Sequence, residues 1–151
     1  MTSKILPESR PKEGPINVLI VEDNPGDRIL IIQMLRSVET PRFELMHAPN
    51  LASALERVHE GHDVILLDLN LPDSEDLDTL QRMHAEVPEM PIIVLTGMAG
   101  QKMGLETMAH GACDYLIKGK IDAHLLVQAI IRHVNNRGQN SAAGNAAPGI
   151  R

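Results

Sequence analysis

The stretch Val64-Ile65-Leu66-Leu67-Asp68-Leu69-Asn70-Leu71-Pro72 decides the fold class of this chain. Four aliphatic residues run directly into a carboxylate, and a proline follows four positions after Asp68. A continuous apolar run this short, with β-branched residues at its start, predicts a strand that is covered on both faces, as in parallel sheets. Open parallel sheets bind ligands beyond the carboxyl ends of their strands. Asp68 is therefore expected either to begin a solvated turn or to be a reacting group.

Four other segments predict strands, and three of these also end at polar side chains. Since four of the five predicted strands end in this way, chance is a poor explanation. The segments are residues 18–21, followed by Glu22 and Asp23; residues 43–48; residues 92–95, followed by Thr96; and residues 115–117, followed by Lys118.

Apolar side chains at helical spacing follow each predicted strand. Asn24, Asn50 and Asp122 are expected to cap the first, second and fifth helices, and Pro25 fits the first helical position. The apolar stripes consist of Ile31, Met34, Leu35 and Val38; Leu51, Ala54, Leu55 and Val58; Leu77, Leu80, Met83 and Val87; Leu105, Met108, Ala109 and Ala112; and Leu126, Ala129, Ile130 and Val134.

This alternation of strands and helices predicts an α/β fold with a doubly wound, five-stranded parallel sheet. We expect the flavodoxin-like strand order 2-1-3-4-5, with helices on both faces. The loops that follow the strands then meet at one edge of the sheet. Glu22, Asp23, Asp68, Thr96 and Lys118 should therefore lie around a single crevice.

One domain over residues 16–136 accounts for all of these elements. Residues 1–15 contain prolines and charges without an apolar period, which predicts a disordered leader. Residues 137–151 are rich in Gly, Asn, Ser and Ala, which predicts a disordered tail or a linker.

Composition excludes several functional classes. The chain has 151 residues, a formal net charge of -6 and no Lys/Arg cluster, so no direct contact with nucleic acid is expected. It has no apolar run approaching the roughly 20 residues that cross a bilayer, so no membrane contact is expected. The single cysteine, Cys113, excludes an internal disulfide and favours a reducing compartment. We therefore expect a soluble, cytoplasmic protein.

The predicted crevice has the parts needed for phosphoryl transfer. Three carboxylates, Glu22, Asp23 and Asp68, would repel one another unless a positive charge lay between them. Lys118 supplies one such charge, and hard oxygen ligands suit Mg2+, with the backbone carbonyl of Asn70 as a further ligand. Asp68 would then be the nucleophile, while Lys118 and Thr96 hold phosphoryl oxygens.

From about Ile16 to Asn136, the chain resembles the receiver domain of two-component response regulators. The resemblance rests on Glu22-Asp23 after the first strand, Asp68 with Pro72 four residues later, Thr96 after the fourth strand, and Tyr115 three residues before Lys118. Together these features are specific, whereas each one alone is weak.

The resemblance implies a signalling switch, not an enzyme that turns over a substrate. Asp68 would accept a phosphoryl group from a phosphohistidine on a sensor histidine kinase or a histidine phosphotransfer protein, with Mg2+ required. Thr96 would then move toward the phosphoryl group and Tyr115 would change rotamer. This would alter the face formed by helix 4, strand 5 and helix 5, which would bind a downstream protein effector.

Some residues near the site depart from the family pattern or add to it. Gly119 stands where the family usually has proline, and Asp76 where glycine is common. Gly97 fits, because a small residue there gives the phosphoryl group access. Methionines on or near the fourth helix suggest core packing or, alternatively, an adaptable docking surface; they are Met98, Met103 and Met108.

Two other functions remain open from the sequence. The chain could be a receiver module excised from a larger protein such as a hybrid histidine kinase, a diguanylate cyclase or a phosphatase. It could also hydrolyse small phosphate esters through an aspartyl intermediate, as haloacid-dehalogenase enzymes do. Those enzymes need a second aspartate two residues after the nucleophile, and Asn70 at that position disfavours turnover.

Overall fold

The five predicted strands form one parallel sheet. The computed structural model describes residues 14–97 and 101–146, and it gives side chains for 14–97 and 104–137. The sheet has the strand order β2-β1-β3-β4-β5 and every pairing is parallel, which confirms the predicted topology. The strands are β1 (Ile16–Val21), β2 (Phe43–Ala48), β3 (Val64–Asp68), β4 (Ile92–Thr96) and β5 (Asp114–Ile117).

The strand register brings the polar strand ends together. Val21, the last residue of β1, pairs with Leu67 of β3, so Glu22 and Asp68 follow at neighbouring positions. Asp68 pairs with Leu95 of β4, and Thr96 pairs with Ile117 of β5, immediately before Lys118. The carboxyl edge of the sheet therefore gathers these residues from four adjacent strands, as predicted.

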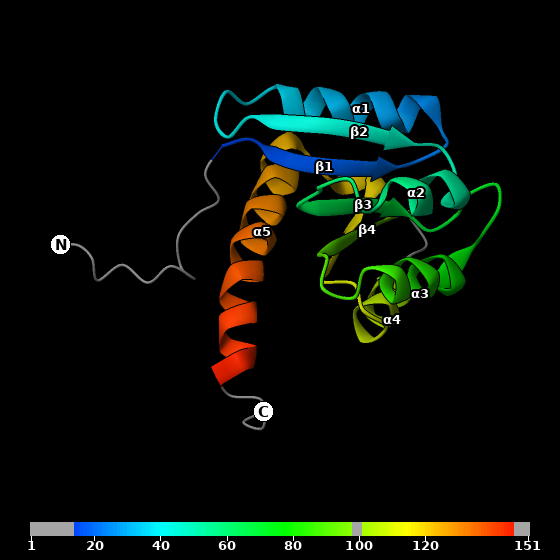
Figure 1. Ribbon diagram of the computed structural model, residues 1–151. Helices are drawn as coiled ribbons and strands as arrows, with labels where there is room; N and C mark the ends of the chain where they lie inside the picture. The colour runs from blue at the N-terminus through cyan, green and yellow to red at the C-terminus, as the bar shows by residue number, and fades with distance from the viewer. Residues whose placement is uncertain (1–13, 98–100, 147–151) are drawn as a thin grey trace.

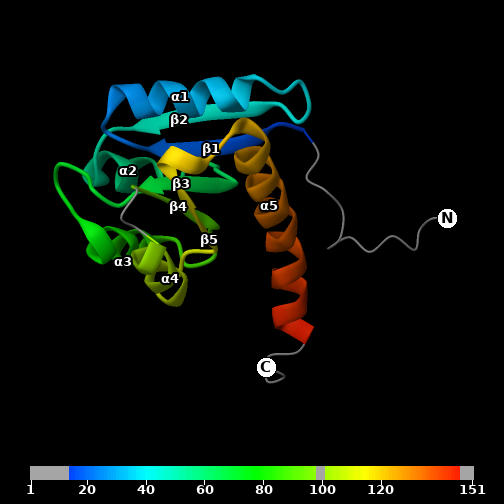
Figure 2. The same ribbon diagram turned by 180° about the vertical axis from the view of Figure 1, so that it is seen from behind.

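Helices cover both faces of the sheet (Figures 1 and 2). One apolar core joins the strands to α1 and α5, and the second joins them to α2 and α3. Both cores consist mainly of aliphatic side chains, which fits the 1% aromatic content. The helices are α1 (Pro25–Arg36), α2 (Leu51–Arg57), α3 (Asp76–Glu86), α4 (Gln101–Ala109) and α5 (Ala123–Ala146), and a 3-10 turn, η2, covers Lys118–Lys120.

The predicted helix caps are present. The Asn24 side chain accepts a hydrogen bond from the backbone N–H of Asp27 at 2.9 Å, and Asn50 accepts one from Ser53 at 2.8 Å. Asp122 accepts one from the N–H of Leu125 at 2.8 Å. Each bond satisfies a donor at a helix N-terminus that has no intrahelical partner.

The apolar stripe predicted for the fourth helix is wrong in its orientation. Leu105 and Met108 are 63% and 43% exposed, whereas Gly104 and Thr107 are buried. The reason is the close approach of α4 to β5, where the ring of Tyr115 lies against the Cα of Gly104. A small residue thus defines the inward face of α4. Met98 and the side chain of Met103 lie outside the described residues.

The predicted end of the last helix is also wrong. We expected regular structure to stop near Asn136, but α5 continues to Ala146 and runs past the edge of the sheet (Figure 2). An established helix gains one hydrogen bond for each residue added, and this can outweigh the weak helix propensities of Asn, Ser and Gly. The leader predicted over residues 1–15 falls almost wholly on residues 1–13, outside the described residues.

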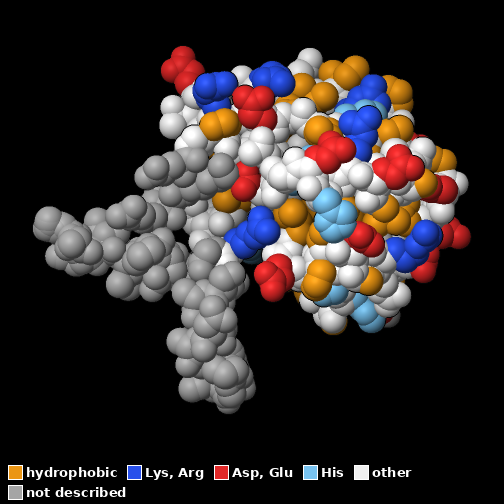
Figure 3. Space-filling model, viewed as in Figure 1, with side chains coloured by type: hydrophobic (Ala, Val, Ile, Leu, Met, Phe, Trp, Pro, Cys, Tyr) orange, Lys and Arg blue, Asp and Glu red, His pale blue; other side chains and the backbone are white. Residues whose placement is uncertain are grey.

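The surface seen in Figure 3 carries interspersed charges of both signs, with Lys and Arg side chains beside Asp and Glu. Among the residues that the structure describes, no helix is both long enough and apolar enough to cross a bilayer.

Candidate functional site

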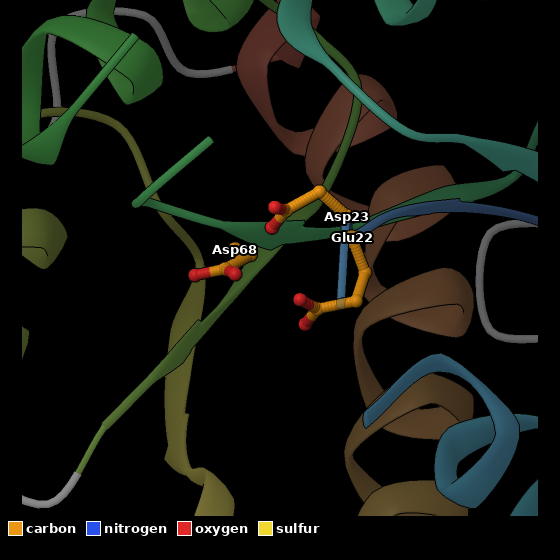
Figure 4. Close-up of side chains that lie close together, drawn as sticks. All are labelled: Glu22, Asp23 and Asp68. Carbon is orange, nitrogen blue, oxygen red and sulfur yellow. The ribbon is translucent and has the colours of Figure 1, made fainter. Parts of the chain in front are cut away.

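Three carboxylates converge at the ends of β1 and β3. Glu22, Asp23 and Asp68 each place one carboxylate oxygen within 4.8 Å of those of the other two. Figure 4 shows the three side chains pointing toward a common space. Glu22 and Asp68 are buried, at 0% and 6% exposure, while Asp23 is open to solvent. The predicted acidic cluster is therefore assembled by the fold.

Lys118 is the cation of this cluster. Its Nζ lies 2.9 Å from Glu22 Oε1 and 3.1 Å from Asp68 Oδ2. A third carboxylate contact, 3.0 Å from Asp27 Oδ2, comes from the first turn of α1. We did not predict Asp27 from the sequence. The signal was its place in the first turn of a helix that begins at the functional edge.

Negative charge exceeds positive charge at this site. Burial, and after it the hydrogen bond with Asp68, raises the pKa of Glu22 to about 7, against the opposing effect of Lys118. Burial alone would lower the pKa of Lys118, but its contacts with Glu22, Asp27 and Asp68 raise it above its ordinary value. One ammonium is therefore shared among several acids, and the site favours a further cation.

The donor set fits Mg2+. Carboxylate oxygens on short loops are the ligands that this ion prefers, and the exposed Asp23 leaves one side open for the water ligands that it retains. The backbone N–H of Asn70 donates to Asp68 Oδ1 at 3.1 Å, so the predicted fourth ligand residue adjoins the cluster. In the described part of the chain, this is the one group of three or more potential metal ligands.

The loop after Asp68 is anchored on both sides. Asp73 accepts hydrogen bonds from the backbone N–H groups of Leu51 and Ala52, at 2.8 and 2.9 Å, which lowers the pKa of Asp73 and ties the loop to the start of α2. The Thr79 hydroxyl donates to the carbonyl of Leu69 at 2.9 Å. These contacts hold the residues on either side of Asn70 in place.

The backbone of Asp76 adopts a conformation that favours glycine. Its φ is +53°, in the left-handed region that glycine adopts without steric cost. Aspartate is one of the few other residues that tolerate this conformation. The turn geometry therefore persists although the glycine is absent.

Thr96 and Tyr115 differ in their relation to the cluster. Thr96 is buried at the end of β4, one residue beyond the register partner of Asp68, and its hydroxyl lies 3.5 Å from the carbonyl of Gly97. Tyr115 lies within β5 and is partly buried against the core that includes α2 and α3. Its ring contacts Gly104, so it links β5 to α4.

Known proteins are similar to this chain in sequence and in fold. The transcriptional regulatory protein BasR of Escherichia coli (strain K12) is 27% identical over 128 residues, which are 83% of this chain and 56% of BasR. The methanogenesis regulatory protein FilR1 of Methanothrix harundinacea is 33% identical over 109 residues, which are 70% of this chain and 24% of FilR1. The chain thus spans about half of one relative and about a quarter of the other.

Solved structures agree with these relatives. A CheY-like receiver domain protein from Methanospirillum hungatei JF-1 has the same fold, with a TM-score of 0.72 at 23% identity over 84% of this chain and 99% of that one. The receiver domain of a sensor histidine kinase from Pseudomonas aeruginosa PAO1 gives a TM-score of 0.68 at 27% identity over 80% and 98%. That structure holds a magnesium ion coordinated in its active site cleft.

The family profile described as response regulator receiver domain matches residues 18–131. This range includes every strand end at the carboxyl edge, from Glu22 to Lys118, and the first part of α5. The chain therefore belongs to the response regulator receiver domain family of two-component signal transduction.

Proposed function

We propose that Asp68 accepts a phosphoryl group and that this receiver domain thereby switches a protein-interaction surface. The observation that supports this most directly is the setting of the Asp68 carboxylate. One of its oxygens accepts the Asn70 N–H, and the other lies 3.1 Å from the Lys118 ammonium. The carboxylates of Glu22 and Asp23 lie beside it. A nucleophile is thus held in place where charge can be neutralised.

The transfer would form one bond and break one. A carboxylate oxygen of Asp68 attacks the phosphorus of a phosphohistidine, the O–P bond forms, and the P–N bond breaks with its electron pair going to the imidazole nitrogen. Lys118 would pair with an equatorial phosphoryl oxygen, and Thr96 would donate its hydroxyl hydrogen to another.

Glu22, Asp23, Asp68 and the carbonyl of Asn70 would hold Mg2+. When bound, the ion would supply positive charge that offsets the repulsion between the incoming phosphoryl group and the carboxylates. No turnover of a released substrate is required, so we infer a phosphoacceptor and not a hydrolytic enzyme.

The donor would be a sensor histidine kinase or a histidine phosphotransfer protein in the cytoplasm. The output would be a downstream protein that binds the face of α4, β5 and α5, without direct contact with nucleic acid or membrane. The exposed apolar side chains Leu105 and Met108 on α4 and Leu125 on α5 support this face. Flexible methionine and leucine side chains suit an adaptable protein contact.

Incubation with acetyl phosphate tests the phosphoacceptor role. Intact mass should show one added phosphoryl group with Mg2+ present and none after chelation or in Asp68→Asn. Asp63→Asn, which changes an acid at the opposite edge of the sheet, is the matched control and should be labelled normally. Label that persists in Asp68→Asn would contradict the proposal.

The proposed switch of Tyr115 has a convenient probe. The chain has one tyrosine and no tryptophan, so its intrinsic fluorescence reports on this residue. A Cβ added at Gly104 would overlap the ring, so Gly104→Ala should displace it. We expect phosphorylation to change the emission of the unmodified protein and to change that of Gly104→Ala less.

Leu105→Ala, on the exposed side of the same helix, is the control for that variant and should keep the full fluorescence response. Equal responses in Gly104→Ala and Leu105→Ala would exclude the ring position beside Gly104 as part of the switch.

A further inference from the structure

Asp27 gives Lys118 a carboxylate partner outside the predicted metal ligands. Its Oδ2 lies 3.0 Å from Lys118 Nζ, across 91 positions of sequence. Asp27 is held at the start of α1, where its backbone N–H donates to the side chain of Asn24. Its side chain is 41% exposed, whereas that of Asp68 is 9% exposed and that of Glu22 is fully buried.

Three carboxylates surround the Lys118 ammonium. An ammonium carries three N–H donors, and three carboxylate oxygens lie within 3.1 Å of Nζ, from Glu22, Asp27 and Asp68. A phosphoryl group on Asp68 would bring further oxygens within reach of the same ammonium. The carboxylates of Glu22 and Asp27 therefore compete with these oxygens for Lys118 Nζ.

Asp27 is the partner that Lys118 can release at the lowest cost. Glu22 is buried, so leaving its charge without a partner carries a large desolvation penalty. The Asp27 side chain, by contrast, already contacts solvent. The Asp27 carboxylate can thus regain hydrogen bonds from water when Lys118 leaves it.

We propose that Asp27 holds Lys118 in the unphosphorylated protein and competes with the phosphoryl group for this ammonium, thereby setting how readily Asp68 is phosphorylated. Asp27 is a positioning residue here, because it acts through Lys118 and touches neither the phosphorus nor the nucleophile. The inference rests on the proposed role of Asp68 as phosphoacceptor.

Phosphorylation rates of the full chain test the competition. With acetyl phosphate and saturating Mg2+, Asp27→Asn should be labelled about two to five times faster than the unmodified protein, the range expected for a partly exposed ion pair. Asp27→Glu restores a carboxylate on a longer side chain and should return the rate toward the original value. Glu44→Gln removes an equal charge from an exposed ion pair with Arg42 and should leave the rate unchanged.

Ionic strength separates a direct contact from long-range repulsion. The Debye length falls to about 3 Å at 1 M salt, so a rate difference caused only by repulsion of the phosphodonor should disappear there. Competition within the contact at Lys118 should persist. Disappearance of the difference at high salt overturns the proposal.

The NMR chemical shift of the 15N-labelled Lys118 ammonium reports on this contact directly and does not depend on the stability of α1. It should change on phosphorylation of the unmodified protein, and in unphosphorylated Asp27→Asn it should already differ from its original value. A rate in Asp27→Asn equal to or below that of the unmodified protein overturns the inference. Failure of the unmodified protein to accept phosphate would instead overturn the proposed function.

Discussion

Acids at the two edges of the sheet have very different partners. At the amino edge, Asp63 Oδ2 accepts both the backbone N–H and the side-chain N–H of Asn17, at 2.7 and 3.3 Å. Asp114, at the start of β5, lies 3.0 Å from Nε2 of His133 on α5. Each of these carboxylates has at least one donor residue, and Asp114 also contacts Arg132 and accepts the Tyr115 N–H. They join neighbouring elements and have the character of structural contacts.

At the carboxyl edge, several acids depend on one donor. Glu22, Asp27 and Asp68 share the ammonium of Lys118, and the carboxylate of Asp23 adds to the excess charge. Burial alone does not separate the two edges, since Asp63 and Asp114 are also partly buried. The two edges differ in the number of carboxylates for each donor residue. The excess of carboxylates at the carboxyl edge indicates that a cation is favoured there.

Replacement of Asp23 should give the largest contrast between the edges. Asp23→Asn removes an exposed carboxylate of the cluster, so the core should be unaffected. Loss of an outer-shell partner alone typically lowers metal affinity by about 10- to 100-fold, and loss of a direct ligand should lower Mg2+-dependent labelling at least as much. Labelling as a function of Mg2+ concentration measures this. Unchanged metal dependence would show that Asp23 does not hold the ion.

At the amino edge, replacement of an acid should lower stability and leave phosphorylation unchanged. Asp63→Ala removes the acceptor of the partly buried Asn17 N–H, and loss of such a hydrogen bond costs about 0.5–1.5 kcal/mol of unfolding free energy. Urea denaturation should show this loss, while phosphorylation of the folded fraction stays normal. Reduced phosphorylation of Asp63→Ala under conditions in which it is fully folded would contradict a purely structural role for the amino edge.

Sequence patterns were sufficient for features that depend on local chemistry. Four short aliphatic runs ending at polar residues predicted correctly that these residues gather at the carboxyl edge, because parallel strands place their carboxyl ends together. Asn24 and Asn50 identified helix starts through the hydrogen bonds that their side chains accept. The helix starts were predictable because each depends on a residue and its immediate neighbours, and the strand ends because parallel pairing follows a general rule.

Tertiary contacts decided the features that the sequence did not predict. The ring of Tyr115 turned α4 so that Gly104 faces inward and Leu105 outward, although hydrophobicity alone favours the opposite. Asp27 meets Lys118 across the fold, and no spacing in the sequence identifies such a pair. The roles of Thr96 and Tyr115 in switching stay predictions, since they concern a second state of the protein.

The smallest expected contrast is the pH dependence of stability in the metal-free protein. Burial and the neighbouring Asp68 raise the pKa of Glu22 from 4.5 to about 7, so the folded state binds a proton more tightly than the unfolded state. The stabilisation from this proton is complete below pH 4.5 and is lost as the pH rises toward 7. The loss should be on the order of 1 kcal/mol.

Glu22→Gln isolates this contribution, because the amide cannot titrate. In EDTA, the unfolding free energy of the unmodified protein relative to that of Glu22→Gln should fall between pH 5 and pH 8. Mg2+ should reverse the trend in the unmodified protein, since a cation favours the ionised carboxylate that the buried site otherwise disfavours. When Asp63→Asn is the reference in place of Glu22→Gln, the relative unfolding free energy should not fall over this pH range. A relative stability that does not change with pH would show that shared charge at the carboxyl edge leaves Glu22 ionised without a metal.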